Sequence, residues 1–250
     1  MNKKNKNSFT ILGINGAKSI LQTERFHSIN IDILIGGPAE KSKSLMEMIF
    51  SSNLKHRFYE KKGFFQKYPE GRSQGIAVTF SGHIVSQELP DFSNENNACL
   101  LALDQIEDPQ NFGQIIRTAE CAGVHGILFP RHSSASISNT VLQVSQGAFI
   151  NVPLIEVTNL KNTFSELKDD GFWIVGLENS IKARPWYNID YNDKTLIVIG
   201  SEGRGIREKV LASCDFKTTI PMQGITGSLN VSAAVSAVLF ERLRQIRENN

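Results

Sequence analysis

From Ala98 to the carboxyl end, short apolar runs alternate with segments in which apolar residues recur at helical spacing. The runs predict strands at Leu100 to Leu103, Gly126 to Phe129, Val152 to Val157, Phe172 to Leu177, Thr195 to Ile199 and Phe216 to Met222. The intervening segments predict helices at Asn111 to Ala122, Thr140 to Ala148, Thr163 to Leu167 and Glu208 to Cys214, and a longer one at Val231 to Ile246. This alternation predicts an α/β domain with a parallel sheet covered on both faces.

A smaller unit precedes this domain and is predicted to have an α/β fold of its own. Its clearest strands are Ile31 to Ile35 and Gly75 to Phe80, and Lys41 to Phe50 has the spacing of a helix. The polar stretch Gln87 to Asn97 has too little apolar surface to bury, which predicts a linker. We expect a flexible tail at residues 1–9, a small domain at 10–82, a linker at 83–97 and the larger domain at 98–250.

Composition excludes several classes of protein but identifies none. With 40% hydrophobic and 21% charged residues, the 250-residue chain can bury a core, which excludes a disordered or fibrous protein. No apolar run approaches the roughly 20 residues of a membrane span, and neither a secretory signal nor an Arg-rich leader opens the sequence. The net charge of +2 would not repel a nucleic acid but is too small to require one.

The cysteines and histidines indicate neither disulfides nor a metal site. Cys99, Cys121 and Cys214 are odd in number, far apart and set in apolar neighbourhoods, which is typical of a reducing cytoplasm. The five histidines form no paired spacing with one another or with the cysteines, so no zinc site is expected. We predict a cytoplasmic protein with no metal and no membrane partner.

A glycine-rich segment, Gly200 to Ile206, follows a predicted strand and lies where open α/β sheets bind ligands. Glycine allows a ligand to approach the backbone closely. The segment lacks the Lys and Ser or Thr of a phosphate-binding P-loop, and its glycine spacing is the reverse of a dinucleotide-binding motif. Taken alone, a tight turn is the simpler interpretation, although the carboxylate of Glu202 favours a functional site.

Two further segments resemble ordinary helix starts when each is taken alone. Asp108 and Pro109 form a good start for the helix that follows them. Arg117 lies away from the main apolar stripe of that helix, so it could simply be solvated. The other segment runs from Ile220 to Ser232, and its small polar residues suit the capping of the last helix.

Together, in this order and at these intervals, the three segments closely resemble the signature motifs of the SpoU-TrmH methyltransferases, which belong to the SPOUT superfamily. The motifs are matched by Asn111, Gly113, Arg117 and Gly123, then by Gly200 to Gly203, and finally by Ile220 to Met222 with Ser228 to Ser232. Their conjunction is highly specific. The resemblance covers the region from Ala98 to about Glu248.

The resemblance implies a fold, a cofactor and an assembly. Domains of this family end in a trefoil knot, which holds S-adenosyl-L-methionine mainly through backbone groups. Here those groups are expected at Gly200, Ile220 and Leu229. The family is typically homodimeric, with each active site close to the interface or shared across it.

The resemblance also implies an activity, the transfer of a methyl group to a ribose 2'-hydroxyl of RNA. Arg117 would be the central catalytic residue, and it would be arranged with the target nucleotide by Asn111, Glu202, Ser228 and Asn230. Because a guanidinium gives up its proton only at great cost, we expect Arg117 to anchor a phosphate and to polarise the hydroxyl. The proton could leave to Arg117, to a neighbouring group or to water.

Within the family, the small domain is most similar to the ribosomal-protein-like domain of the bacterial 23S rRNA guanosine 2'-O-methyltransferases. The similarity rests on Ile11 to Gly13 and on Ser73 to Ile76, where Ser73 stands in place of a frequent His. Independently, basic residues interleave with aromatic ones from Lys55 to Arg72, which suits phosphate attraction and base stacking. A solvated face over an ordinary core would give the same pattern.

Two alternatives to a 23S rRNA (guanosine-2'-O-)-methyltransferase stay open. A tRNA ribose 2'-O-methyltransferase of the same family would carry the same motifs, and only the small domain argues for ribosomal RNA. A non-catalytic RNA-binding ribosome-assembly factor could keep the fold without binding S-adenosylmethionine. A generic nucleotide-binding enzyme is disfavoured, because the phosphate-loop lysine and the dinucleotide motif are missing.

Overall fold

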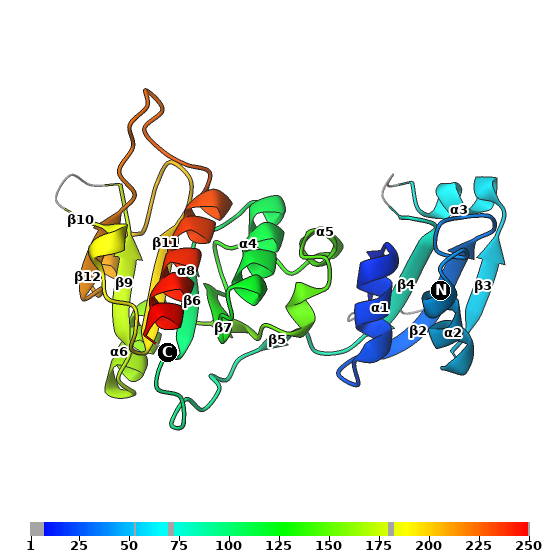
Figure 1. Ribbon diagram of the computed structural model, residues 1–250, viewed down its shortest axis with the longest axis horizontal. Coiled ribbons are helices and arrows are strands. Elements are labelled where there is room, and N and C mark those ends of the chain that lie inside the picture. Colours follow the sequence, from blue (N-terminus) through cyan, green and yellow to red (C-terminus); the bar gives the residue numbers. More distant parts are fainter. Residues whose placement is uncertain (1–7, 53, 70–72, 180–182, 250) are drawn as a thin grey trace. The chain divides into compact units, whose positions relative to one another are not determined.

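The computed structural model describes residues 8–52, 54–69, 73–179 and 183–249. They form two compact units, each with its own sheet (Figure 1). The first unit comprises the chain up to Ile84 together with Ser138–Ile150, and the second comprises Val85–Ile137 and the chain from Asn151 onward. Among the described residues, no helix is long and apolar enough to cross a membrane.

The first unit is built on a four-stranded sheet. Strand β4 (Ile76–Ser81) runs antiparallel to both its neighbours, β1 (Ser8–Leu12) and β2 (His27–Leu34), and β3 (His56–Tyr59) pairs in parallel with β2 at the edge. The strands β1, β2 and β3 are followed by helices α1 (Ile14–Gln22), α2 (Lys43–Ser51) and α3 (Lys61–Lys67). The core of the unit is made by fully buried side chains that include Ile20, Ile31, Ile49, Phe64 and Phe80.

Helix α5 (Asn139–Val144) and the short 3-10 helix η1 (Ala148–Ile150) belong to the first unit, although residues of the second unit precede and follow them in the chain. The amide of Gln143 accepts a hydrogen bond from Leu12 N at 2.6 Å and donates one to Leu12 O at 2.8 Å. The ring of Phe149 lies 5.8 Å from that of Phe26 and 6.0 Å from that of Phe80. The segment therefore supplies partners to the edge strand β1 and apolar surface to the core of the first unit.

The second unit is built on an eight-stranded sheet whose pairings are all parallel. From one edge to the other, its strands are β10 (Arg184–Pro185), β12 (Phe216–Thr219), β9 (Trp173–Leu177), β11 (Thr195–Gly200), β6 (Cys99–Asp104), β7 (Gly126–Pro130), β8 (Leu154–Val157) and β5 (Val85–Ser86). Strands β6, β7 and β11 are buried throughout, which explains their continuous apolar runs. The predicted α/β class with a parallel sheet is confirmed.

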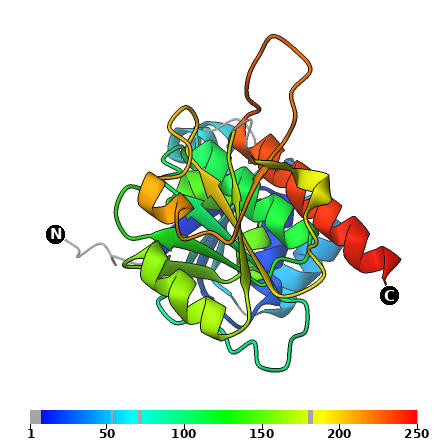
Figure 2. The same ribbon diagram turned by 90° about the vertical axis from the view of Figure 1, so that its left-hand side faces the viewer.

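Helices cover both faces of this sheet (Figures 1 and 2). Helices α6 (Leu160–Asp169) and α7 (Glu208–Leu211) pack against one face, in a core cluster that includes Phe164, Leu196 and Val198. Helices α4 (Pro109–Cys121) and α8 (Val231–Glu248) lie side by side on the other face. The loop between β12 and α8, drawn in orange, projects beyond the sheet in Figure 2. It carries the third predicted motif.

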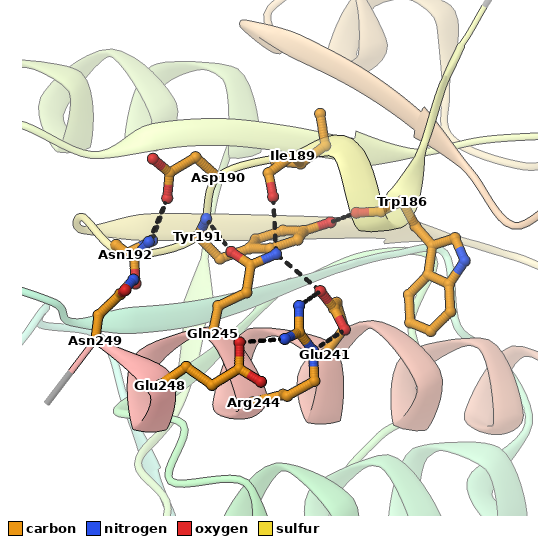
Figure 3. A network of polar contacts seen from close by, with 10 residues as sticks. All are labelled: Trp186, Ile189, Asp190, Tyr191, Asn192, Glu241, Arg244, Gln245, Glu248 and Asn249. Atoms are coloured by element: carbon orange, nitrogen blue, oxygen red, sulfur yellow. Dashed lines mark hydrogen bonds and ion pairs between the residues drawn. The ribbon is translucent and has the colours of Figure 1, made fainter.

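A polar network ties the last turns of α8 to the chain that follows β10 (Figure 3). The side-chain oxygen of Gln245 accepts a hydrogen bond from Tyr191 N at 3.0 Å, and its nitrogen donates to Ile189 O at 3.0 Å and to Glu241 Oε1 at 2.9 Å. The fully buried ring of Tyr191 donates its hydroxyl to Trp186 O in the 3-10 helix η2 (Trp186–Asn188) at 3.0 Å. The side-chain amide of Gln245 thus satisfies two backbone groups of the segment after β10.

The structure changes three boundaries drawn from the sequence. Strand β1 begins at Ser8, inside the tail expected at residues 1–9, of which 1–7 lie outside the described residues. The linker expected at residues 83–97 contributes β5 to the larger sheet, and it buries Phe92 in the core. Two residues are enough to form β5, because the edge strand β8 has unpaired backbone groups with which they can form hydrogen bonds. The segment around α5 joins the first unit. The trefoil knot stays a prediction.

Candidate active site

The glycine turn begins where β11 ends. After Gly200 the chain folds back on itself, and Gly205 N donates a hydrogen bond to Ser201 O at 2.9 Å. A Cβ atom on Gly200 would lie 2.0 Å from the carbonyl carbon of Gly205, so no other residue fits there without moving the turn. Gly203 and Gly205 have φ angles of +82° and +68°, which favour glycine. The tight-turn interpretation is therefore correct for these glycines, and it does not exclude a ligand.

A buried carboxylate fixes the far end of this turn. Asp104, the last residue of β6, is fully buried and accepts hydrogen bonds at 2.8 Å from both the backbone N and the Nε of Arg207. The Arg207 guanidinium also forms an ion pair with Asp104 at 2.7 Å. The glycine turn is thus anchored to a strand in the middle of the sheet, which gives it a fixed shape before any ligand binds.

The three predicted motifs meet in one cluster of hydrogen bonds. Glu202 Oε1 accepts from Asn230 Nδ2 at 2.8 Å and from Asn111 Nδ2 at 3.2 Å, and Asn230 Nδ2 also donates to Asn111 Oδ1 at 3.0 Å. Each of the three side chains therefore contacts the other two. The cluster joins the glycine turn, the first turn of α4 and the start of α8, which are far apart in the chain.

Capping interactions explain why two helices begin at this cluster. Asp108 caps α4 by accepting from Gln110 N at 2.9 Å, with Pro109 as the first helical residue. Asn230 caps α8 by accepting from Ser232 N at 2.9 Å. The Glu202 carboxylate accepts from the first backbone N–H of α8, that of Val231, at 3.2 Å. A negative charge near the amino end of a helix is favourable, so Glu202 stabilises the start of α8 as well as the cluster.

A large cavity of about 800 Å³ opens beside this cluster. Six of the predicted site residues line it, namely Gly200, Glu202, Ile220, Ser228, Leu229 and Asn230. Its size is within the roughly 300 to 1,000 Å³ typical of sites for small molecules and cofactors. All three expected cofactor-binding positions thus belong to one cavity.

A second, smaller cavity of about 170 Å³ adjoins the first. Four residues line both cavities, namely Ser201, Glu202, Arg204 and Val231. The smaller cavity is also lined by Gln105, Ile106, Glu107, Asp108 and Asn111. The predicted Asn111 therefore belongs to the smaller cavity, and Glu202 belongs to both.

Arg117 is the one predicted site residue that lines neither cavity. It lies on α4 with its side chain exposed, and within the described part of the chain its guanidinium makes no hydrogen bond or ion pair. The neighbouring Gln114 accepts from Ser232 Oγ at 3.0 Å, so this face of α4 does reach the start of α8. The catalytic role of Arg117 stays a prediction.

Several residues of the site did not stand out in the sequence. Asn179 follows the carboxyl end of β9, lines the large cavity and donates a hydrogen bond to Gly227 O at 2.6 Å. Asp104 is the last residue of β6, and Gln105, which follows it, lines the smaller cavity. The rule that ligands bind at the carboxyl ends of parallel strands could have found all three. Nothing in the sequence distinguishes Arg204, which lines both cavities.

Residues 98–240 match the SpoU rRNA methylase family, and this range includes every residue of the cluster. The chain belongs to that family. It is 41% identical over 180 residues to a TrmH family tRNA/rRNA methyltransferase of Staphylococcus aureus, which covers 69% of this chain and 71% of the relative. It is 39% identical over 184 residues to RlmB of Pseudomonas aeruginosa, a 23S rRNA (guanosine-2'-O-)-methyltransferase, which covers 72% and 73%.

Solved structures support the same fold. AviRb of Streptomyces viridochromogenes, a SpoU methyltransferase, aligns with 98% of this chain and 91% of its own, with a TM-score of 0.80 and 18% identity. In its complex with the cofactor AdoMet, AviRb aligns with 98% of this chain and 94% of its own, with a TM-score of 0.78 and 21% identity. These likenesses confirm the predicted fold, and the match over residues 98–240 confirms the family predicted from the three motifs.

Proposed function

We propose that this protein is an S-adenosylmethionine-dependent RNA methyltransferase that modifies the ribose 2'-hydroxyl of a guanosine in 23S ribosomal RNA. The observation that carries the proposal is the convergence of Asn111, Glu202 and Asn230 beside a cavity of cofactor size. Membership of the SpoU family and the similarity to RlmB support the activity and the substrate.

The large cavity fits S-adenosylmethionine in size and in chemistry. Leu177, Ile199 and Leu229 provide apolar walls for an adenine ring, and the turn at Gly200 exposes backbone at close range. We propose that the backbone of Gly200, Ile220 and Leu229 holds the cofactor. When bound, S-adenosylmethionine supplies a methyl group activated by its positively charged sulfur.

The protein's own contribution is to position the ribose and to manage its proton. Much of the catalysis of a methyl transfer can come from aligning two bound reactants. In the proposed mechanism, Asn111, Glu202, Ser228 and Asn230 orient the target nucleotide. Arg117 anchors a phosphate and stabilises the negative charge that develops on the 2'-oxygen, while the proton passes to a neighbouring group or to water.

We also propose that the protein acts as a homodimer. On α8, which lies beside α4, the ring of Phe240 is 48% exposed, and an apolar side chain of this size suits burial against a second copy of the chain. Because Arg117 is exposed on α4 and lines neither of the two cavities described above, a second copy of the chain packed against α4 would complete its surroundings. A dimeric mass for the wild type and a monomeric mass for Phe240→Asp in sedimentation would support this dimer. A monomeric wild type would contradict the dimer, and a dimeric Phe240→Asp would contradict the interface on α8.

The first unit is the proposed RNA-binding domain. On and around its edge strand β3, the rings of Phe50, Phe58 and Phe65 are 58%, 41% and 37% exposed. The same stretch of the chain carries exposed basic side chains, namely Lys55, Arg57, Lys61 and Lys62. Exposed rings and cations in one segment are suited to stacking on bases and attracting phosphates.

Other residues of the same interleaved run, and Ser73 directly after it, have structural roles. Phe64 is fully buried, and Lys67 forms an ion pair with the buried Asp32 at 2.5 Å. Ser73 is 2% exposed and its hydroxyl accepts from Gly75 N at 3.3 Å, so it shapes a turn. Arg72 lies outside the described residues. The proposed RNA surface is therefore smaller than the run from Lys55 to Arg72.

A methylation assay tests the proposed function. Purified protein would be incubated with labelled S-adenosylmethionine and either 23S ribosomal RNA or total tRNA, and methylated riboses would be mapped. We expect one guanosine of the ribosomal RNA to be methylated, and no methylation with Arg117→Ala although cofactor binding is retained. Methylation of tRNA alone would favour the tRNA enzyme. Failure of calorimetry to detect cofactor binding would favour a non-catalytic assembly factor.

A further inference from the structure

The smaller cavity has the size of a subsite. Its volume of about 170 Å³ is below the roughly 300 to 1,000 Å³ of pockets that enclose a whole small molecule. It shares Ser201, Glu202, Arg204 and Val231 with the larger cavity, so the two spaces meet along this wall. Such a space suits one residue of a longer ligand that continues into solvent.

Two features of the wall indicate that a ligand belongs there. Gln105 has a φ angle of +64°, a left-handed conformation that is uncommon for residues other than glycine and that tends to occur at functional sites. The hydroxyl of Ser201 is buried, and no hydrogen-bond partner is found for it among the described residues. Because a buried hydroxyl without a partner is costly, a small shift of the glycine turn that lets a bound ligand supply one would be favoured.

Arg204 is an uncommitted cation at the junction of the two cavities. It is exposed between Gly203 and Gly205, and it forms no ion pair or hydrogen bond with any residue that the structure describes. This holds although the carboxylates of Glu107 and Glu202 line the same cavity. A guanidinium that no carboxylate occupies keeps its charge and its paired donors for a phosphate.

The covalent structure of RNA connects these observations. The 2'-oxygen and the 3'-phosphate of a ribonucleotide are attached to adjacent carbons of one ring, so a 2'-hydroxyl that faces the cofactor brings its 3'-phosphate close to the same point. We propose that the smaller cavity receives the target ribose and that Arg204 binds its 3'-phosphate. This inference rests on the proposed methyltransferase function, and the contact is additional to that proposed for Arg117.

The test measures how RNA binding depends on salt. Wild type, Arg204→Ala and Arg204→Lys would be titrated with a 23S ribosomal RNA transcript at several salt concentrations. Loss of one phosphate contact is expected to reduce the slope of log affinity against log salt by about 0.7 to 0.9. We expect Arg204→Ala to raise the KM for RNA by about 10-fold or more, and Arg204→Lys to keep the wild-type slope because it keeps the charge.

Two controls separate this contact from other causes. Arg247→Ala removes an exposed arginine at the far end of α8 and should leave slope and KM unchanged. Calorimetry with S-adenosylmethionine should give the same Kd for Arg204→Ala as for wild type. An unchanged salt slope, or a loss of cofactor affinity, would overturn the assignment of Arg204. A wild-type protein that methylates no RNA would instead overturn the proposed function, while the slopes would still decide whether Arg204 binds a phosphate.

Discussion

Oxygen Oε1 of Glu202 accepts three hydrogen bonds, from two asparagine side chains and from the backbone of Val231. Glu202→Ala removes all three, so the two asparagines are expected to lose their fixed positions and methylation to slow by about 100-fold. Glu202→Gln keeps an acceptor oxygen and should be less affected. Single-turnover methylation rates would measure this, with Glu166→Ala on the exposed side of α6 as the control. A wild-type rate in Glu202→Ala would show that the cluster has no role in turnover.

Asp32 is a second residue with several partners, in the first unit. Its burial disfavours the charged carboxylate, but hydrogen bonds from Lys67, Tyr68 and Asn30 outweigh burial and hold the pKa of Asp32 below its usual value. Burial likewise opposes the charge on Lys67, and the bond to Asp32 outweighs it and raises the pKa of Lys67. Burial, with the nearby carboxylate, raises the pKa of Tyr68 to about 12.

These shifts predict how stability depends on pH. A lowered Asp32 pKa stabilises the folded state above about pH 4, and this contribution is lost as the pH falls further; the Lys67 contribution is lost above about pH 10. Because Lys67 is 46% exposed, we expect Asp32→Asn to lower the free energy of unfolding by only about 2 kcal/mol at pH 7. Urea unfolding from pH 2 to 7 would measure this. Glu47→Gln, exposed on α2, is the control, and equal losses in both variants would refute the prediction.

At the scale of elements, the carboxyl-terminal helix depends on one side chain for much of its polar contact with the segment after β10. Gln245→Ala would leave Tyr191 N and Ile189 O without their partners (Figure 3). We expect it to lower the free energy of unfolding by about 1 to 3 kcal/mol. Arg244→Ala removes the ion pairs that an exposed guanidinium makes with Glu241 and Glu248, and it should lower the free energy of unfolding less than Gln245→Ala does. Denaturant unfolding of both variants would test this order, and the reverse order would contradict it.

The same scale shows what the sequence could and could not predict. Buried parallel strands such as β6 and β11 are continuous apolar runs, so all six strands expected after Ala98 are present, with bounds that differ by a few residues. Strands β1 and β3 were not predicted, because their polar and apolar residues are mixed and their partners are remote in the chain. For the site, the motifs identified the glycine turn and the helix caps. Arg204 becomes a candidate for a phosphate-binding residue only from the structure, in which it lines both cavities.

At the scale of the molecule, order along the chain does not define the two units. Phe149 is fully buried in the first unit, although it lies between strands of the second. We expect Phe149→Ala to lower stability by about 3 to 5 kcal/mol and to increase hydrogen exchange in β1 and β4, with little effect on β7 and β8. Phe164→Ala, in the core of the second unit, should give the opposite pattern of exchange. Identical patterns in the two variants would mean that the units unfold together.

The position of Asn230, the member of the Glu202 cluster that is synthesised last, has a consequence for biosynthesis. Asn230 caps the helix that closes the described chain, whereas Asn111 and Glu202 precede it by 119 and 28 positions. During translation, the first unit and most of the large sheet can emerge from the ribosome while the cluster still lacks this residue. If the proposed function is correct, a nascent chain folds its proposed RNA-binding unit before it can methylate, and methylation has to wait until Asn230 has emerged.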